Sequence, residues 1–554
     1  MATPPGAGAR PVFADDEHLA SYYLLRRLDE GLGDKVAILY GARRYTYAEV
    51  ADRARRFAEL LLRADIRRGE RVLLVLPDTP PFAWAFFGTL LRGAVVAMGN
   101  PEAPSSNIEY LVRYTRATAI VTVPKVADRL ELAAAGLDEL RRVWIVPETA
   151  TGEDPEAPLG RSPLGVTGDR MARSALAEAL TSTPPLSRKI AIHRDEPAMW
   201  LFTSGSTGEP KANIHTHRDY MFNTEVYAKG TVGYAQGDVT VSVPRLFFGY
   251  ATGTNLMFPF AVGATTGLFS ERPTPESVSQ AIATYRATVV TNVPTMLGKL
   301  LDHDETERAA GEPGLDLASV RFSLSAGEAL PGPLLDRWLA RFASDVYDGI
   351  GSAEMFHIYA SNRPGDVKVG SLGKVVEGYE LRVLPEDADG PGATPCAPGE
   401  IGVLWVKGDS VSQGYFLDRD RSFKVFHGHW CRTGDLFRMD EEGYLYFAGR
   451  ADDLLKVGGQ WVAPVEVEEC LMRHDAVRLA AVVGVEEDGL VKAHAYVELK
   501  TGIARPHAEL ERELQDFVRE RLAKYKYPRA ITFVDELPKN DRGKVDKKAL
   551  RART

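Results

Sequence analysis

The sequence predicts an α/β protein with a large N-terminal domain of stacked αβ subdomains and a small α+β domain at the C-terminus. Helical patterns such as residues 47–66 alternate with short apolar runs such as 71–77 and 118–123, which is typical of sheets covered by helices. The length of 554 residues suits two to four domains. Near residue 450 a turn-rich β sequence gives way to a segment with its own alternation of helices and strands.

The N-terminal elements follow from local patterns. FAWAFFGTLL (82–91) is followed by Arg92 and is too short to span a bilayer, so a buried helix is expected there. The segment 147–189 is rich in Pro, Gly, Ser and Ala and predicts a surface excursion that includes one short helix, RSALAEAL (173–180). Turn-rich strand patterns at 399–416 and 443–450 suit a β-barrel-like subdomain.

The C-terminal segment has enough elements for a domain of its own. Its helical patterns lie at 465–474 and 508–522, and its strand patterns lie between them at 479–485 and 493–499. The sequence GRADD (449–453) separates this segment from the β-rich part. We therefore expect an N-terminal core over 1–449 and a separate small domain over 450–554.

Composition bounds the class of function. An apolar fraction of 45% and a charged fraction of 26% are ordinary for a globular protein, and the net charge of −9 argues against a general nucleic-acid or anionic-membrane binder. Three cysteines far apart predict neither a disulfide framework nor a metal site. The first residues show no apolar signal-peptide region. A cytoplasmic protein, a monomer or a homodimer, is expected.

The stretch TSGSTGEPKA (203–212) has the composition of an anion-binding loop. Glycines let backbone N–H groups turn toward an anion, hydroxyls add donors, and Lys211 adds charge. The loop lies between two stretches with strand character, 198–202 and 212–217, and its Gly205-x-x-Gly208-x-x-Lys211 spacing differs from a Walker loop. An ordinary P-loop NTPase is therefore disfavoured, and a flexible polar hairpin remains the alternative.

Five further motifs accompany this loop in a fixed order. They are SAGEALP (325–331), GIGSAE (349–354), CRTGD (431–435), GRADDLLKVGG (449–459) and LPKNDRGK (537–544). Together they resemble the adenylate-forming superfamily, which includes acyl- and aryl-CoA synthetases, luciferases and peptide-synthetase adenylation domains. The resemblance implies that a carboxylate attacks the α-phosphate of ATP and releases pyrophosphate, after which a thiol takes the acyl group and releases AMP.

The resemblance assigns the phosphate and metal contacts. The loop would hold the phosphates that leave as pyrophosphate and would neutralise their charge. Glu354 and Thr207 would help to hold Mg²⁺, a cation that prefers oxygen ligands. The loop residues are Thr203, Ser204, Gly205, Ser206, Thr207, Gly208 and Lys211.

The nucleotide itself would be held by residues of the later motifs. Asp435 would accept hydrogen bonds from the ribose hydroxyls, Arg450 would contact ribose and phosphate, and Phe447 would pack on the base, although Phe447 alone could equally belong to the core. The adenine slot would be lined by Gly327, Glu328, Ala329, Gly349 and Ile350.

The C-terminal domain would carry the moving parts. Lys544 would bridge the carboxylate and the α-phosphate and offset their mutual repulsion, which makes it the expected catalytic lysine together with Glu354. Asp452 would be the hinge on which the domain rotates between the two half-reactions. Lys456, Gly458 and Gly459 would then form the CoA or thiolation face; an exposed lysine is the plain alternative for Lys456.

Two positions depart from the superfamily pattern. Ala353 stands where the family usually has Thr before the acidic residue, and Ala212 follows Lys211 where glycine is usual. Neither change removes a charged group, so we expect an active enzyme with one hydroxyl contact fewer.

The acid is expected to be aromatic. The stretch LFFGYATGTN (246–255) has no acidic residue to hold the ammonium of an α-amino acid, and it resembles the benzoate-CoA ligase branch. The resemblance implies an apolar slot suited to one aromatic ring. Its walls would be Gly249, Tyr250, Ser325, Gly327, Ile350 and His357.

One glycine suggests a substituted ring. Gly249 occupies a position where the branch commonly has alanine, and the missing methyl suggests room for a substituent, as in anthranilate, salicylate or hydroxybenzoate. His357 is a hydrogen-bonding candidate for that substituent or a structural histidine. His215 and His217 share a strand face, but they lack a third ligand for a metal, and we expect His217 to border the acyl pocket.

The acceptor thiol is either coenzyme A or the pantetheine arm of a separate carrier protein. The benzoate-branch resemblance favours CoA. A third alternative is a relative that has lost turnover and only binds its ligands, but Lys211, Glu354, Asp435 and Lys544 are all retained.

Overall fold

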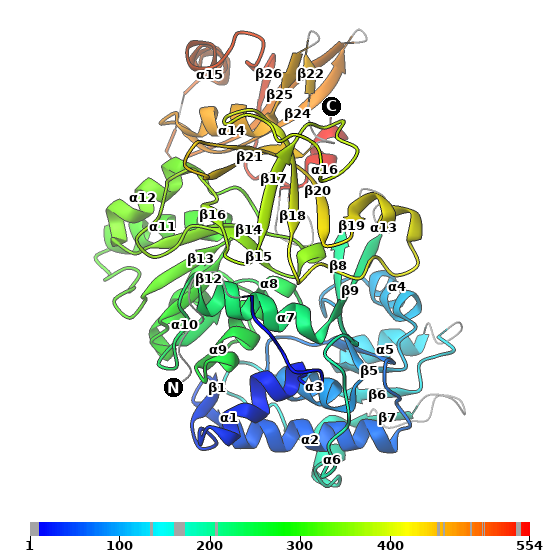
Figure 1. The fold of residues 1–554 in the computed structure, drawn as a ribbon. Coiled ribbons are helices and arrows are strands. Elements are labelled where there is room, and N and C mark those ends of the chain that lie inside the picture. Colours follow the sequence, from blue (N-terminus) through cyan, green and yellow to red (C-terminus); the bar gives the residue numbers. More distant parts are fainter. Residues whose placement is uncertain are drawn as a thin grey trace.

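The structure is a computed structural model of the chain. It describes residues 10–132, 137–159, 172–204, 209–450, 455–457, 460–487, 490–500, 502–503, 505–538 and 545–553. Two large sheets with their helices and a smaller antiparallel sheet form one large unit, and the segment after residue 455 forms a small unit against it, at the top of Figure 1.

The first large sheet has seven strands in the order β7-β6-β5-β3-β4-β8-β9. All neighbours are parallel except β8 and β9, which form an antiparallel hairpin. Its central strands β3, β4 and β5 are apolar and buried almost throughout, as expected of parallel strands with both faces covered. The strands are β3 (Arg71–Val75), β4 (Val95–Met98), β5 (Ala119–Thr122), β6 (Arg142–Ile145), β7 (Ala172–Ala175), β8 (Pro197–Ser204) and β9 (Pro210–Thr216).

Helices α2 to α6 connect these strands. The first of them, α2, begins at a capping box in which Thr46 and Glu49 each bond the other's backbone N–H. Their bounds are α2 (Tyr47–Arg63), α3 (Pro80–Arg92), α4 (Ser105–Thr115), α5 (Pro124–Leu132) and α6 (Leu176–Thr181).

The second large sheet has nine strands in the order β16-β15-β14-β13-β12-β10-β11-β1-β2. Its centre, from β14 to β1, is parallel, and antiparallel strands close both edges. The strands are β1 (Val36–Tyr40), β2 (Arg43–Thr46), β10 (Val239–Ser242), β11 (Thr265–Leu268), β12 (Val289–Asn292), β13 (Phe322–Ser325), β14 (Val346–Gly351), β15 (Ile358–Ser361) and β16 (Lys374–Val375).

The helical segments of this part include the ones that border the site. They are η1 (Ser21–Leu25), α1 (Arg26–Asp29), α7 (His217–Asn223), η2 (Thr224–Lys229), α8 (Gly249–Thr252), η3 (Gly253–Met257), α9 (Phe258–Ala261), α10 (Pro275–Tyr285), α11 (Pro294–Ala309), α12 (Gly332–Phe342) and η4 (Ala353–Met355).

A five-stranded antiparallel sheet stands where the sequence predicts a barrel-like subdomain. The long strand β20 pairs with β18, β19 and β21. Its elements are β17 (Glu380–Leu384), β18 (Gly402–Lys407), α13 (Arg419–Val425), β19 (Phe426–His427), β20 (Trp430–Met439) and β21 (Leu445–Arg450).

The small unit has hydrophobic clusters of its own, built only from residues after 454. A three-stranded sheet, β24-β25-β26, packs on helices, and a hairpin of β22 and β23 precedes it. Its elements are β22 (Leu455–Val457), β23 (Gln460–Val462), α14 (Pro464–Met472), β24 (Val477–Glu487), β25 (Leu490–Leu499), α15 (His507–Arg521), β26 (Ala530–Phe533) and α16 (Lys547–Arg551).

Most local predictions are confirmed, and one is partly wrong. The helices expected at 47–66 and 82–91 are α2 and the buried α3. The helix expected over 173–180 begins only at Leu176, because Ala172–Ala175 form edge strand β7 instead. This strand pairs with β6 through backbone hydrogen bonds, and tertiary pairing overrides the local helix propensity of an Ala-rich segment.

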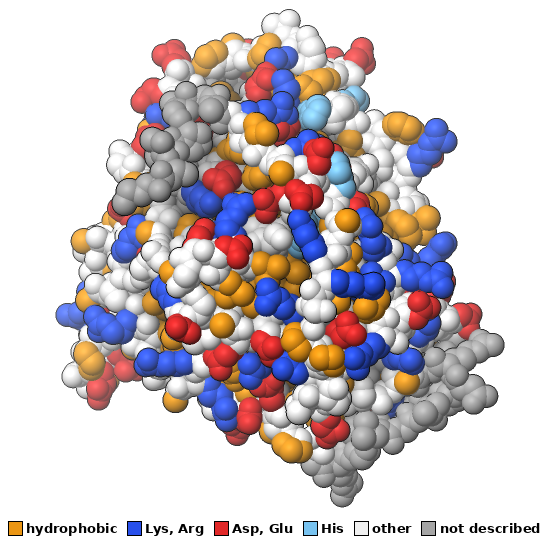
Figure 2. Space-filling model, turned by 60° about the horizontal axis from the view of Figure 1, so that its bottom comes forward, with side chains coloured by type: hydrophobic (Ala, Val, Ile, Leu, Met, Phe, Trp, Pro, Cys, Tyr) orange, Lys and Arg blue, Asp and Glu red, His pale blue; other side chains and the backbone are white. Residues whose placement is uncertain are grey.

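Two observations bear on membrane and nucleic-acid binding by the described part of the chain. No helix there is long and apolar enough to cross a membrane. On the face shown in Figure 2, the basic and acidic side chains of the described residues are interspersed. This mixture agrees with a sequence that has 67 basic and 76 acidic residues.

Candidate active site

A pocket of about 480 Å³ opens where the two large sheets meet. Met98 and Gly99 reach it from the carboxyl end of β4, and residues 326–329 reach it from the carboxyl end of β13. Ligands of open α/β sheets bind outside the carboxyl ends of strands, and the volume is ordinary for a small-molecule site.

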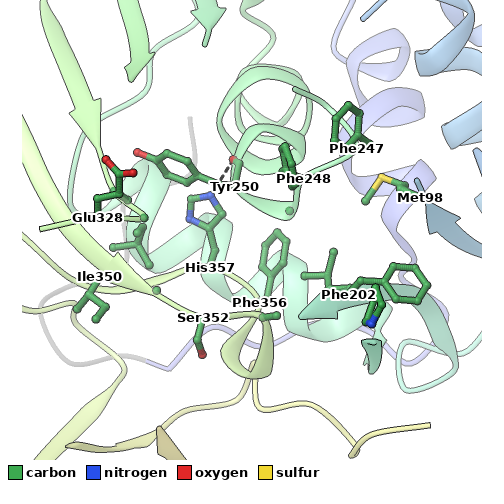
Figure 3. Close-up of a pocket in the computed structure, with 18 of the residues that line it drawn as sticks. Met98, Phe202, Phe247, Phe248, Tyr250, Glu328, Ile350, Ser352, Phe356 and His357 are labelled. Carbon is green, nitrogen blue, oxygen red and sulfur yellow. Dashed lines mark hydrogen bonds between the residues drawn. The ribbon is translucent and has the colours of Figure 1, made fainter. Parts of the chain in front are cut away.

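Many of the residues singled out in the sequence lie together in this pocket. Helix α8 brings Tyr250, and the turn after η4 brings Phe356 and His357 (Figure 3). Strands β20 and β21 bring the carboxylate of Asp435 and the ring of Phe447. The sequence-derived residues that line it are Gly249, Tyr250, Gly327, Glu328, Ala329, Gly349, Ile350, His357, Asp435 and Phe447.

One residue of the pocket lining, His357, is packed among aromatic rings. Four aromatic rings surround its imidazole. The distances between ring centroids are 4.8 Å to Phe258, 5.3 Å to Tyr250, 5.4 Å to Phe356 and 5.6 Å to Tyr227. His357 reaches this position because residue 253 is glycine: a Cβ built there would lie 2.7 Å from the imidazole. The imidazole is thus held by packing on all these elements.

The protonation of His357 follows from its surroundings. Burial lowers the pKa of His357 to about 4, so the ring is neutral near pH 7 and carries one N–H. Its Nε2 lies 3.1 Å from the carbonyl oxygen of Tyr250, which can only accept, so Nε2 is the donor. Nδ1 is therefore a bare acceptor, and it has no hydrogen-bond partner among the described residues.

The other part of the lining, which includes Gly327, Glu328, Asp435 and Phe447, combines a backbone turn with side chains that contact neighbouring residues. Gly327 has φ of 93°, a left-handed conformation that favours glycine. The carboxylate of Glu328 accepts a hydrogen bond from the hydroxyl of Thr295 at 2.7 Å. Phe447 packs on Phe437 with centroids 5.4 Å apart. Asp435, also in the wall, lies opposite Arg450 in the pairing of β20 with β21.

Glu354 lies in η4, behind the pocket wall formed by Ser352 and Ala353. Its Oε1 accepts a hydrogen bond from the hydroxyl of Tyr415 at 2.8 Å, and its carbonyl oxygen accepts one from the N–H of Ser412 at 2.8 Å. No cluster of three His, Cys, Asp or Glu residues suited to a metal occurs in the described ranges. A metal here would need ligands from a bound phosphate in addition to Glu354.

The histidine pair of β9 and α7 is structural. Nε2 of His215 lies 2.6 Å from the carbonyl oxygen of Ala353, and its Nδ1 lies 3.0 Å from the carboxylate of Asp219. His215 therefore braces the residue before Glu354. The expectation that His217 borders the acyl pocket is wrong: it is buried elsewhere, and its Nδ1 accepts a hydrogen bond from the N–H of Leu19.

Lys211 is engaged by a carboxylate. Its Nζ lies 2.7 Å from Oδ2 of Asp418, the N-cap residue of α13, and this hydrogen bond lowers the pKa of Asp418. Thr203 lies opposite Lys211 in the β8–β9 pairing. Neither lines the pocket. Ser325, the last residue of β13, is also buried outside the pocket lining.

Several predicted residues cannot be placed. Gly205, Ser206, Thr207, Gly208, Asp452, Gly458, Gly459 and Lys544 lie outside the described residues, as do the side chains of Ser204, Arg450 and Lys456.

The sequence reading missed part of the lining. Phe247 and Phe248 come from the turn before α8, and Leu201 and Phe202 come from β8. It also missed Asp348, a buried carboxyl beside the site whose pKa burial raises to about 8. Their signal is position rather than motif: they lie in, or shortly after, strands whose carboxyl ends meet at the site.

The space beside Gly249 is bordered on one side by Leu201. A Cβ at residue 249 would lie 3.0 Å from Cδ1 and 3.2 Å from Cδ2 of Leu201. The room for a ring substituent that the missing methyl suggests stays a prediction, and Leu201 limits that room on its side.

Comparison with known proteins agrees with this architecture. The family model "AMP-binding enzyme" matches residues 25–416, and "AMP-binding enzyme C-terminal domain" matches residues 466–544. The benzoate–CoA ligase of Thauera aromatica is 38% identical over 95% of this chain and 94% of its own length. The 4-hydroxybenzoate–CoA/benzoate–CoA ligase of Rhodopseudomonas palustris is 34% identical over 97% of this chain and 94% of its own length.

A solved structure shows the same fold. The anthranilate CoA ligase AuaEII, crystallised with anthranoyl-AMP, is 32% identical, superposes with a TM-score of 0.87, and covers 98% of each chain. The chain belongs to the AMP-binding enzyme family, the adenylate-forming superfamily, within its benzoate-CoA ligase-like branch.

Proposed function

We propose that the protein is an ATP-dependent aryl-CoA ligase whose acid is a benzoate with a hydroxyl or amino group on its ring. The carboxylate attacks the α-phosphorus of ATP to form the aryl-adenylate and pyrophosphate. The CoA thiol then attacks the acyl carbon, loses its proton, and expels AMP. Relatives that act on benzoate and hydroxybenzoate support an aromatic acid, and so do the aromatic rings of the pocket lining, Phe202, Phe247, Phe248, Tyr250 and Phe356.

The ring substituent is inferred from His357. A bare imidazole nitrogen buried without a partner is costly, and a donor on the ligand would remove that cost. In Figure 3 the ring nitrogen that makes no hydrogen bond is on the side of His357 that faces Tyr250 and Ile350. A hydroxyl or amino group can donate to this nitrogen, whereas a fluorine or methyl group of similar size cannot.

The nucleotide site is part of the same proposal. The adenine would be bordered by Gly327–Ala329, Gly349 and Ile350. Asp435 would accept hydrogen bonds from the ribose hydroxyls, and Arg450 would contact the ribose and the phosphate. The loop from Thr203 to Gly208 and Lys211 would hold the departing pyrophosphate. The backbone turn at Gly327 and the position of Asp435 in the pocket wall support these roles.

Magnesium fits this chemistry through Glu354. Mg²⁺ is commonly held by one or two carboxylates together with substrate phosphates, and Glu354 supplies one carboxylate oriented by Tyr415. The ion would neutralise charge on the phosphates, and Thr207 would add a hydroxyl ligand.

The moving domain completes the proposal. We assign residues 1–449 to the core and 450–554 to a mobile domain, with Asp452 as the hinge, Lys544 as the catalytic lysine, and residues 456–459 as the thiolation face. In Figure 1, β22 is drawn at the far end of the small unit, and α16, just after Lys544 in sequence, is drawn on the side toward β20.

A matched substrate panel tests the proposal. The purified protein is given ATP, Mg²⁺ and CoA with benzoate and with hydroxy-, amino-, fluoro- and methylbenzoates of each ring position, and aryl-CoA is measured by mass spectrometry. We expect aryl-CoA and AMP with CoA alone, and a higher kcat/KM for a donor-bearing acid than for the fluoro acid of the same position. A protein that forms the adenylate but transfers it only to a carrier protein would favour the alternative acceptor.

A variant of His357 tests the substituent. His357→Phe should reduce the hydroxy-to-fluoro ratio of kcat/KM by about tenfold, the value of one hydrogen bond to a neutral group. His303→Phe, a histidine of α11 outside the pocket lining, is the matched control and should leave the ratio unchanged. An unchanged ratio in His357→Phe contradicts the donor preference.

A further inference from the structure

One wall of the pocket is built by a leucine and a glycine from different elements. Leu201 lies in β8 with its side chain 4% exposed, and Gly249 is the first residue of α8. Both line the pocket. The two delta carbons of Leu201 are the atoms nearest to the position of a Cβ at residue 249, at 3.0 and 3.2 Å.

The backbone does not require glycine at residue 249. Its φ is not in the left-handed region, and it occupies a helical position, where alanine is the more favourable residue. The reason for glycine is therefore the space around it. Carbon atoms in contact normally lie about 3.5–4.0 Å apart, so alanine at residue 249 would force Leu201 to move.

Leu201 can move in few directions. Its backbone is fixed between β4 and β9, because Trp200 pairs with Ala97 and Leu201 pairs with Asn213. Because protein interiors are close-packed, a displaced side chain of Leu201 would move into the open volume of the pocket.

We propose that Leu201 is a specificity-determining residue of the aryl pocket, and that Gly249 acts on the substrate only through the room it gives to Leu201. This inference rests on the proposed function, since it concerns the acid that the same pocket takes. With glycine at 249, the side chain of Leu201 lies back against α8 and leaves room for the ring; with alanine it is displaced toward the ring.

A double-mutant cycle separates this coupling from a direct contact of residue 249 with the substrate. The variants are Gly249→Ala, Leu201→Ala and the double variant, each assayed for kcat/KM with benzoate and with its methyl derivatives. Gly249→Ala should lower the ratio of methylbenzoate to benzoate by about tenfold, the value of one methyl group in a pocket. In the Leu201→Ala background, the same substitution should change the ratio less than twofold.

Equal effects of Gly249→Ala in both backgrounds would overturn the inference, because residue 249 would then contact the ring itself. Leu372→Ala, another leucine of the lining, serves as the control background and should leave the effect of Gly249→Ala intact. If the unmodified protein activates none of the acids, the proposed function fails, whereas additive effects in an active enzyme refute the coupling alone.

A second readout does not depend on turnover. Gly249→Ala should lower the melting temperature when Leu201 is present, because the two side chains collide. It should raise the melting temperature in the Leu201→Ala background, because alanine then only improves the helix. The same sign of change in both backgrounds would contradict the proposed contact.

Discussion

At the scale of single residues, burial sets the chemistry of the ionisable groups. Asp348 lies in β14, 3% exposed, and burial raises its pKa to about 8. Burial lowers the pKa of His357 for the same reason, since in both residues it disfavours the charged form of the side chain. Both groups are therefore neutral near pH 7.

Asp348 should make the stability of the protein depend on pH. Between about pH 4 and about pH 8 the folded protein keeps a proton that the unfolded chain loses, so stability falls as pH rises, by up to about 1.4 kcal/mol per pH unit. Asp348→Asn removes this term. The melting temperature of Asp348→Asn minus that of the unmodified protein should therefore increase steadily between about pH 5 and about pH 8. A difference that stays constant would show that Asp348 is ionised in the folded protein.

Asp418 should compete with ATP for Lys211. The pair is partly exposed, so its contribution is about 1 kcal/mol, and removal of the charge should lower the KM for ATP about fivefold. Asp418→Asn keeps an acceptor for the N–H of Arg421 at the start of α13. Asp420→Asn on the same helix is the control. An unchanged or higher KM for ATP in Asp418→Asn would mean that Lys211 does not contact the nucleotide.

Many residues of the site could be predicted from sequence motifs. The others could not, because only the folded structure brings them next to the site. Tyr250, Glu328 and Asp435 stand in recognisable motifs and line the pocket. Leu201 stands in no recognised pocket motif, and only its contact across to α8 reveals its role. The same holds for Asp418, whose approach to Lys211 joins residues 207 positions apart in the sequence.

At the scale of elements, the site depends on close approach of η3 and the turn that carries His357. Periodicity predicted α2 well because its apolar residues repeat at helical spacing, and the short apolar run 82–91 predicted the buried helix α3. It did not predict β7, because its strand state depends on pairing with β6. Nor did it predict the brace of His215 on Ala353, which joins β9 to η4.

Gly253→Ala tests the packing of η3. The added methyl would lie 2.7 Å from the imidazole of His357, so we expect a lower melting temperature and a loss of aryl-CoA formation. Gly298→Ala in α11 is a matched helical control, because its nearest contacts would be an ordinary 3.8 and 3.9 Å from Leu334. The control should be neutral or slightly more stable. Equal melting temperatures for both variants would contradict the close approach.

At the scale of the whole molecule, a small unit with its own core rests on the large unit. The guanidinium of Arg478 in β24 lies 3.8 Å from the carboxylate of Asp302 in α11. The guanidinium of Arg337 in α12 lies 3.5 Å from the same carboxylate. Exposed pairs of this kind are weak, which supports the proposal that the small unit changes its position during the reaction.

Lys544→Ala should separate the two half-reactions. Without the ammonium, two anions must meet unshielded, so pyrophosphate exchange should fall by at least about 100-fold. Thioester formation from a supplied aryl-adenylate and CoA should change little, because that step does not need the lysine. Equal loss in both assays would refute the assignment of Lys544 to adenylation.

The fate of the carboxylate oxygen tests the central claim most directly. The protein is given a benzoate with both carboxylate oxygens as ¹⁸O, together with ATP, Mg²⁺ and CoA, and the products are analysed by mass spectrometry. Because the carboxylate attacks the α-phosphorus and the thiol then expels AMP, the account predicts that one ¹⁸O appears in AMP and the other stays in the aryl-CoA. Label in inorganic phosphate, with ADP as the nucleotide product, would contradict the acyl-adenylate mechanism.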